Sequence, residues 1–170
     1  MTLSLYVLRH AKAEDAAAAG GDHERVLRPK GRKAAKLVGQ ALARLEEAPD
    51  LILSSSAARA RETAELAREG GGFSAELELR RELYAGERGE LIAQLAAAGG
   101  QAERILLVGH QPALSLLIAE LAGGEPEFPT AALARIDFEL ERWSELAPGS
   151  GRLVWLLTPE VLAGLRSGAD

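Results

Sequence analysis

The sequence predicts a three-layer α/β/α sandwich, in which helices cover both faces of a mostly parallel central sheet. For most of the chain, short apolar runs that suit buried strands alternate with segments of helical periodicity. Late in the chain, two strand-like runs, 132–140 and 153–157, follow one another without a helix between them. This second observation predicts an antiparallel or hairpin-like addition to the sheet.

Length and composition predict one globular domain that spans residues 1–170. Hydrophobic residues make up 47% of the chain and charged residues 26%, which are ordinary values for a soluble domain. The chain has no cysteine, so disulfides, thiolate metal sites and a cysteine nucleophile are excluded. The net charge of −5 argues against broad nucleic-acid binding, and it confines any cationic cluster to one cleft.

The N-terminus lacks the basic region, apolar core and cleavage site of a signal peptide. No apolar run in the sequence is long enough to span a bilayer. We therefore expect a cytoplasmic protein without a membrane partner, and we also expect a monomer.

The rest of the chain is organised around the stretch 3–12, whose sequence is LSLYVLRHAK. Its apolar run predicts a strand buried on both faces, and the run ends at Arg9 and His10. In open α/β sheets the ligand crevice lies at the carboxyl ends of the strands. An isolated Arg-His pair could still be a solvated edge. The site interpretation gains weight because a second apolar run, 103–110, also ends at a histidine, His110.

A surface loop and a helix follow the first strand. Glycines and polar residues predict a loop, with one helical turn at Glu14–Ala19. Pro29 suits a first helical position, and apolar residues at three-to-four spacing predict a helix over Pro29–Glu47. In the loop, Arg25 could face a ligand or be an ordinary surface arginine.

The next strand, Leu51–Leu53, leads through three serines into a helix predicted over Ala57–Glu69. Such a junction is a ready anion site, because free backbone N–H groups point outward at a helix N-terminus. Arg59 lies in the first turn, so its side chain can reach the same crevice. We expect Arg61 and Arg68 to face solvent or to pair with glutamates.

The remaining elements are predicted from alternation, apolar stripes and glycine or proline punctuation. They are a short or edge strand at Glu76–Leu79, a turn at 83–86, a helix at about Arg88–Ala98 closed by Gly99 and Gly100, a strand at Arg104–Val108, a helix at Ala113–Leu121 begun by Pro112, strands at Ala132–Leu140 and Leu153–Leu157 around a polar turn, a helix at Pro159–Leu165 and a frayed tail at Ser167–Asp170.

If the strand ends converge, Arg9, His10, Arg59 and His110 meet in one pocket, and Arg25 can join them. Several guanidinium groups suit a phosphoryl dianion. An imidazole can attack phosphorus as a nucleophile while a second one donates hydrogen bonds to the phosphoryl oxygens. Positive neighbours lower the pKa of a histidine, which keeps the attacking nitrogen unprotonated near neutral pH.

A metal site is the competing use of two histidines. Zinc requires three or four ligands, and no carboxylate lies at helical ligand spacing from either histidine. Adjacent arginines would also repel a cation. We therefore expect no metal and no cofactor, and we expect the third histidine, His23, to be exposed in its polar loop.

Four segments carry a resemblance to a known family. LRHAKAED is similar to an Arg-His-Gly signature, DHERVLRPKG to an Asp-x-x-Arg-x-Leu stretch, LILSSSAARARETAE to a Ser-Ser-Pro-x-x-Arg-Ala-x-x-Thr-Ala motif, and LLVGHQP to a second-histidine motif. Together, and in this order, they resemble the histidine phosphatase superfamily, the phosphoglycerate mutase-like proteins. Ala11 stands in the third signature position, as is common in the short branch typified by the phosphohistidine phosphatase SixA. Ser56 replaces the motif's proline and Glu62 a usual glutamine.

The resemblance implies a phosphoglycerate mutase-like fold and a role for each matched residue. His10 would be the phosphorylated nucleophile, Arg9, Arg59 and His110 would bind the phosphoryl group, and Arg25 would add a contact. Larger members place a glutamate proton donor after the third strand, and Glu82 in RRELYAG is the nearest match. A good leaving group such as imidazole needs less protonation, which fits a reduced acid.

The resemblance implies a cofactor-independent phosphatase with a phosphohistidine intermediate. We expect its substrate to be a protein phosphohistidine, because the short chain leaves little length for the inserted segments that cover small substrates in larger members. A small phosphate ester is the second hypothesis. The third is a binding module for phosphorylated ligands without turnover, against which the retention of His10 and both arginines argues.

Overall fold

The computed structural model describes residues 2–98 and 100–167. Predictions for Gly99, which was expected to help close a helix, and for the last three residues of the frayed tail lie outside the described residues. Among the described helices, none is long and apolar enough to cross a membrane.

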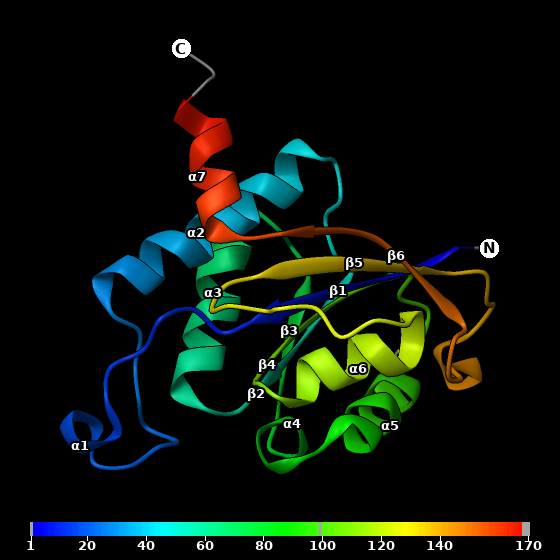
Figure 1. Cartoon of the computed structure of the whole chain (residues 1–170), viewed down its shortest axis with the longest axis horizontal. Helices are drawn as coiled ribbons and strands as arrows, with labels where there is room; N and C mark the ends of the chain where they lie inside the picture. Colours follow the sequence, from blue (N-terminus) through cyan, green and yellow to red (C-terminus); the bar gives the residue numbers. More distant parts are fainter. Residues whose placement is uncertain (1, 99, 168–170) are drawn as a thin grey trace.

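Six strands of the described chain form one sheet, in the order β3-β2-β4-β1-β5-β6 (Figure 1). Strands β3, β2, β4 and β1 are parallel, whereas β5 is antiparallel to both of its neighbours. The bounds are β1 (Leu3–Arg9), β2 (Leu51–Ser55), β3 (Glu76–Arg80), β4 (Arg104–Gly109), β5 (Leu133–Phe138) and β6 (Gly151–Leu157). The predicted mostly parallel sheet, with an antiparallel addition late in the chain, is confirmed.

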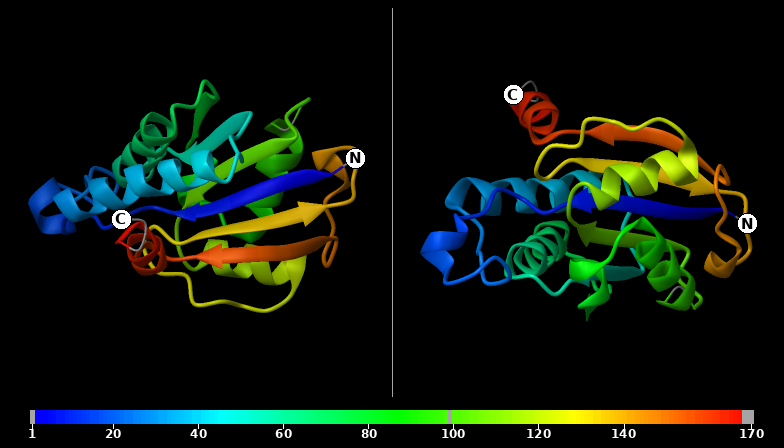
Figure 2. Two further views of the ribbon diagram at one scale, coloured as in Figure 1. Left: turned by 90° about the horizontal axis from the view of Figure 1, so that it is seen from above. Right: turned by 60° about the horizontal axis from the view of Figure 1, so that its bottom comes forward.

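Helices cover both faces of this sheet (Figures 1 and 2). Their bounds are α1 (Ala16–Ala19), α2 (Pro29–Arg44), α3 (Ala58–Gly71), α4 (Glu82–Ala85), α5 (Arg88–Ala98), α6 (Ala113–Ala122), the 3₁₀ turn η1 (Trp143–Glu145) and α7 (Pro159–Ser167). Helices α2, α3 and α7 lie on one face, and α5 and α6 lie on the other. This is the predicted three-layer sandwich.

Alternation along β1 divides the core between the two faces. Leu5 and Val7 pack toward α5 and α6, whereas Tyr6 and Leu8 pack toward α2 and α3. All four side chains are fully buried. Burial of a large apolar side chain contributes about 1.5–3 kcal/mol, so β1 is held from both sides up to the point where its polar residues begin.

Several element ends differ by a few residues from the sequence-based expectation, and those of α2 and β2 have clear physical reasons. Helix α2 ends at Arg44, because Glu46 takes a left-handed conformation with φ of 58° and turns the chain away. Strand β2 continues through Ser54 and Ser55, which are fully buried. A search for hydrophobic runs does not assign serines to a buried strand. Ser54 can be buried because its hydroxyl donates to the Ser55 carbonyl at 3.0 Å. The predicted turn at 83–86 contains the short helix α4.

Helices α2 and α3 approach each other closely at Gly39. A Cβ at this position would overlap the carbonyl oxygen of Ala67 in α3. We expect Gly39→Ala to lower the free energy of unfolding by about 1–3 kcal/mol, the usual range for overpacking a close contact. Urea denaturation measures this change.

Gly164 in α7 is the matched control, since a Cβ there would meet no atom within 4 Å. Gly164→Ala should leave stability unchanged or raise it by about 0.5–1 kcal/mol, because alanine restricts the unfolded chain. Equal midpoints for Gly39→Ala and the wild type would show that the helices can separate at no cost.

Candidate active site

The carboxyl ends of β1, β2 and β4 meet at one edge of the sheet. The register pairs Arg9 of β1 with Gly109 of β4, so His10 and His110 follow at the same level. The backbone N–H of His10 donates to the Gly109 carbonyl at 3.0 Å. The centroids of the two imidazole rings are 5.2 Å apart, and the rings are tilted by 50°. The two histidines at the strand ends therefore lie side by side.

A backbone carbonyl fixes the orientation of His10, which is only 8% exposed. Its Nδ1 lies 2.8 Å from the carbonyl oxygen of Ala11. Since a carbonyl can only accept, Nδ1 carries the proton and Nε2 is left with a free lone pair. Ala11 is held in turn by α3, because its N–H donates to Thr63 Oγ1 at 3.0 Å and that hydroxyl donates to the Arg59 carbonyl at 2.7 Å.

The same reasoning assigns the protons of His110. Its Nε2 lies 2.7 Å from Ser55 Oγ, and that hydroxyl oxygen already accepts the N–H of Ala57 at 3.2 Å. The proton of the Ser55 hydroxyl has no other acceptor among the described residues, so this hydroxyl donates to Nε2 and the proton of the neutral His110 lies on Nδ1. Nδ1 is buried and has no hydrogen-bond partner within the described residues.

Two arginines complete the surroundings of the histidines. Arg9 donates one guanidinium N–H to the carbonyl of Phe128 at 3.0 Å. Arg59, whose side chain is 7% exposed, donates to the Asp22 carbonyl at 2.8 Å and to Asp22 Oδ2 at 3.1 Å. The Nε atoms of both arginines are buried and lack a partner within the described residues. Together with His110 Nδ1 they form three buried donors at one site, an arrangement that a multiply charged anion satisfies.

Both histidines are neutral at physiological pH. Burial is the main reason that the pKa of His10 falls to about 4, the charges of Arg59, Arg9 and Arg25 act in the same direction, and the Ala11 hydrogen bond opposes them. Burial and the charge of Arg59 lower the pKa of His110 to about 3. The Nε2 lone pair of His10 is therefore available as a nucleophile near pH 7.

Asp22, which the sequence reasoning did not select, binds several of the site's donors. Besides Arg59, its carboxylate accepts Arg25 Nη1 at 3.1 Å and the Tyr84 hydroxyl at 2.9 Å. Burial alone would raise the pKa of Asp22, but the hydrogen bonds from Tyr84 and Arg25 and the charge of Arg59 lower it to about 2. Asp22 is thus an ionised carboxylate from the 13–28 loop that occupies part of the arginine cluster.

The 13–28 loop is closed at its base and reaches the site at its tip. A β-bridge joins Ala13 to Leu27, and the Glu14 N–H donates to the Val26 carbonyl at 2.8 Å. The Arg28 N–H donates to the Lys12 carbonyl at 2.9 Å. Asp22 therefore lies on a loop whose two ends are anchored beside His10.

His23 and Tyr84 form one wall of the site. The Tyr84 ring meets His110 edge-on at 5.8 Å and His23 at 4.8 Å between centroids. His23 Nε2 also lies 3.0 Å from Ser56 Oγ. His23 is partly exposed, with 40% of its side-chain surface accessible, but it also contacts the site, and its carbonyl accepts the N–H of Ala58 at the start of α3.

Arg25, expected to add a contact to substrate, and Glu82, the nearest match to a proton donor near the substrate, lie in different surroundings. Arg25 is brought to the site: its Nε donates to the Glu14 carbonyl at 2.7 Å, and its charge acts on His10. Glu82 is exposed, and it forms no hydrogen bond or ion pair with any described residue of the site. It lines a separate depression of about 530 Å³ with Glu87 and Glu90. In α4, Tyr84 rather than Glu82 contacts the histidines.

Arg61 behaves as expected and pairs with Glu65 at 3.8 Å.

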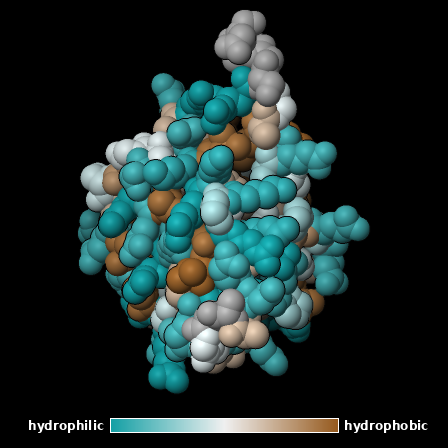
Figure 3. Space-filling view, turned by 90° about the vertical axis from the view of Figure 1, so that its left-hand side faces the viewer, coloured by the Kyte–Doolittle hydropathy of each residue, from teal (hydrophilic) through white to brown (hydrophobic). Residues whose placement is uncertain are grey.

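Among the described residues, no group of three or more histidine and carboxylate side chains could hold a metal ion. The face of the molecule seen in Figure 3 is mostly hydrophilic, with separated apolar patches. The buried cluster of arginines and imidazoles is thus the chemically distinctive feature of this sheet edge.

Comparison with known proteins identifies the family. Residues 5–89 match the family model of the histidine phosphatase superfamily (branch 1). An uncharacterized protein of Mycobacterium tuberculosis is 32% identical over 165 residues, covering 89% of this chain and 99% of that relative. The chain therefore belongs to the histidine phosphatase superfamily.

Solved structures place the chain in the SixA-type branch. A candidate phosphohistidine phosphatase SixA from Nakamurella multipartitia has a TM-score of 0.82 and 31% identity, with 94% of this chain and 97% of that chain covered. The protein histidine phosphatase SixA in complex with tungstate has a TM-score of 0.81 and 27% identity, with 94% and 99% covered. Both the predicted family and the phosphoglycerate mutase-like fold are confirmed.

The low histidine pKa values can be measured directly. In an NMR titration of the imidazole Cε1–H signals, we expect His10 to titrate at about pH 4 and His110 at about pH 3. Arg59→Gln should raise both values, because it removes a positive charge that disfavours the imidazolium. A signal of either histidine that titrates near the ordinary value of 6.5 would contradict the buried, neutral pair.

The ion pair between Asp22 and Arg59 predicts competition with bound anions. We expect Asp22→Asn to strengthen the binding of orthovanadate about three- to tenfold, since it removes a negative charge while an amide can keep part of the hydrogen bonding. Isothermal titration calorimetry measures the dissociation constant.

Asp15→Asn is the matched control for this charge change. Asp15 belongs to the same loop, and its carboxylate pairs with Arg28 at 3.6 Å rather than with Arg59. Its substitution should leave vanadate binding unchanged. Weaker binding to Asp22→Asn than to the wild type would show that Asp22 is needed to orient Arg59, which is the opposite effect.

Proposed function

We propose that the protein is a phosphatase that forms a phosphohistidine at His10 Nε2 and then hydrolyses it. The observation that carries the proposal is the set of three buried donors, Arg9 Nε, Arg59 Nε and His110 Nδ1, beside an unprotonated Nε2. A tetrahedral oxyanion supplies acceptors for several such donors at once. Tungstate bound to the SixA protein, a structural neighbour, supports the same chemistry.

The proposed reaction has two steps. His10 Nε2 attacks phosphorus, and the bond from phosphorus to the leaving atom of the substrate breaks as the Nε2–P bond forms. Arg9, Arg59 and His110 neutralise charge on the oxygens that do not react. Water then attacks the phosphorus of the phosphohistidine, which releases inorganic phosphate and returns the neutral imidazole.

We infer that the preferred substrate is a phosphohistidine carried on a protein. The carboxyl groups near the site are poor proton donors for a leaving group, because Asp22 has a pKa lowered to about 2 and Glu82 is exposed without a contact to the site. An imidazole leaving group needs less help from a proton donor than an alkoxide does. A site without a good proton donor for the leaving group therefore favours phosphohistidine over an alkyl phosphate ester.

His10→Ala tests the nucleophile. We expect hydrolysis of a generic aryl phosphate to fall at least about a thousandfold, because removing a covalent nucleophile removes the main route of the reaction. Rapid acid-free quenching of the wild type with a radiolabelled phosphorylated substrate should trap an acid-labile phosphoryl group, which His10→Ala should not form.

His23→Ala is the matched control. His23 lies at the wall of the same site, and its Nε2 faces Ser56 Oγ at 3.0 Å. It should retain the labelled intermediate. If His10→Ala keeps the activity of the wild type, the nucleophile is another residue and the proposed mechanism is wrong.

The substrate class needs its own comparison. We expect kcat/KM for a phosphohistidine-bearing protein to exceed that for sugar phosphates by about a hundredfold or more, which corresponds to about 3 kcal/mol of transition-state stabilisation. Steady-state kinetics with both substrates at pH 7 measure the ratio. A clear preference for sugar phosphates would instead make the protein a small-ester phosphatase of the same superfamily.

A further inference from the structure

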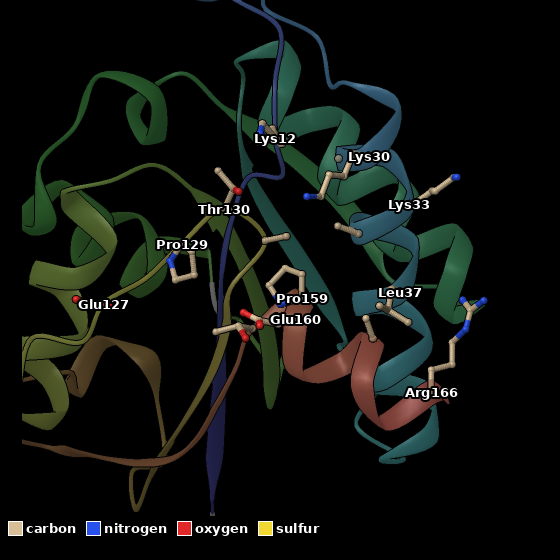
Figure 4. A pocket seen from close by; sticks show the side chains of 15 residues that line it. Lys12, Lys30, Lys33, Leu37, Glu127, Pro129, Thr130, Pro159, Glu160 and Arg166 are labelled. Atoms are coloured by element: carbon tan, nitrogen blue, oxygen red, sulfur yellow. The ribbon is translucent and has the colours of Figure 1, made fainter. Parts of the chain in front are cut away.

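A second cleft lies behind the strand that carries His10, between the start of α2, the start of α7 and the segment 127–131 (Figure 4). Its volume is about 850 Å³, which is within the range of small-molecule binding sites. None of the residues placed in the candidate active site lines it. We call it the α2–α7 cleft.

Four cationic side chains line the α2–α7 cleft: Lys12, Lys30, Lys33 and Arg166. In Figure 4, Lys30 projects from α2 toward the side on which Lys12 and Thr130 lie, whereas Lys33 and Arg166 extend away from that side. Many of the other cationic side chains in the described chain pair with carboxylates, but none of these four forms an ion pair with a described residue.

Two carboxylates, Glu127 and Glu160, also line the cleft. Four positive and two negative groups give the lining a net charge of +2, in a chain whose net charge is −5. Cations that remain unpaired in one concave place raise the local concentration of anions there.

The cleft also offers apolar surface. Its lining includes small and aliphatic residues from α2, α7 and segment 127–131, which we call the apolar floor: Gly31, Ala34, Leu37, Pro129, Ala131 and Pro159. A site with an apolar floor and charged groups at its edge suits an organic molecule that carries an anionic group. Lysine ammonium groups bind phosphate as point charges.

We propose that the α2–α7 cleft binds a small phosphorylated organic molecule, with its phosphate groups at Lys12 and Lys30, where the charge of Lys33 adds to the attraction, and with its organic part over Leu37 and the prolines. This site is separate from the one at which phosphoryl transfer is proposed. The inference does not depend on the enzyme being a phosphatase.

The two sites nevertheless share a wall. Ala131 is one of the residues that line the cleft. Its backbone nitrogen lies 3.1 Å from the carbonyl oxygens of both Arg9 and His10. The carbonyl of Phe128 in the same segment accepts the Arg9 guanidinium. A ligand in the cleft would therefore contact the segment that supports Arg9.

Binding can be measured with two probes, inorganic tripolyphosphate and ATP, on the His10→Ala variant, which cannot turn them over through His10. We expect both to bind at low ionic strength, and ATP to bind more tightly because its nucleoside covers the apolar floor. The double variant Lys30→Glu and Lys33→Glu in this background should weaken both dissociation constants by about tenfold or more.

The matched control is Arg44→Glu with Arg68→Glu, which makes the same change in net charge. These arginines lie in the last turns of α2 and α3 and have no described carboxylate partner. This control should leave binding within about twofold of the parent. In an ¹⁵N NMR titration, ATP should shift the amides of Leu37 and Ala131.

Three results would overturn the proposal. The first is no binding of either probe at about 1 mM. The second is binding that the Lys30 and Lys33 substitutions leave unchanged while orthovanadate displaces it, which would place the anion at the active-site arginines. The third is equal affinity for the two probes, which would remove the role of the apolar floor. None of these results bears on whether the wild type hydrolyses phosphohistidine.

Discussion

The hydrogen bond from His10 Nδ1 to the carbonyl of Ala11 is the interaction on which the rest of the site depends. It decides which ring nitrogen is bare, and it does so through the backbone of the adjacent residue. The residue that carries this carbonyl is itself held through its own N–H, which donates to Thr63 Oγ1 and so links Ala11 to α3. The orientation of the His10 imidazole, the proposed nucleophile, is thus a property of how a strand, its first loop residue and a neighbouring helix pack together.

The site gathers positive charge beside two neutral imidazoles. The chain is acidic as a whole, yet the half-buried Arg9 and the buried Arg59 lie beside two imidazoles that burial and the arginines keep neutral. Hydrogen bonds to protein acceptors offset part of the cost of burying these guanidinium groups: Arg9 donates to the carbonyl of Phe128, and Arg59 donates to Asp22. The same arrangement that tolerates the charges also supplies donors for an anion.

The fold was largely predictable because its strands are short apolar runs that end abruptly in polar residues. The ends of β1 and β4 could be located from His10 and His110 alone, and parallel strands bring such ends to one edge. The part of β2 formed by Ser54 and Ser55 was not predicted, because these serines are buried as hydrogen-bonded hydroxyls and do not extend a hydrophobic run. The position of Arg59 could be inferred from spacing, since a residue in a first helical turn has little choice of direction.

The contacts between loops were not predictable in the same way. Asp22 and Tyr84 are 62 residues apart and meet through a single hydrogen bond, and neither belongs to a periodic segment that would fix its direction. The resemblance to the family pointed to Glu82, two positions from Tyr84, but within this short helix one side chain faces solvent and the other faces His110.

The closed base of the 13–28 loop has a mechanical consequence. Two backbone hydrogen bonds and the Ala13–Leu27 bridge tie the ends of the loop together, and a Cβ at Gly31 would overlap the Lys12 carbonyl, so α2 is pressed against the chain just after His10. The backbone beside His10 is therefore fixed by contacts at the base of the loop and by α2, independently of the contacts that Asp22 makes at the tip. The tip reaches the site through Asp22 and His23, whereas the imidazole of His10 is held at the base by the carbonyl of Ala11.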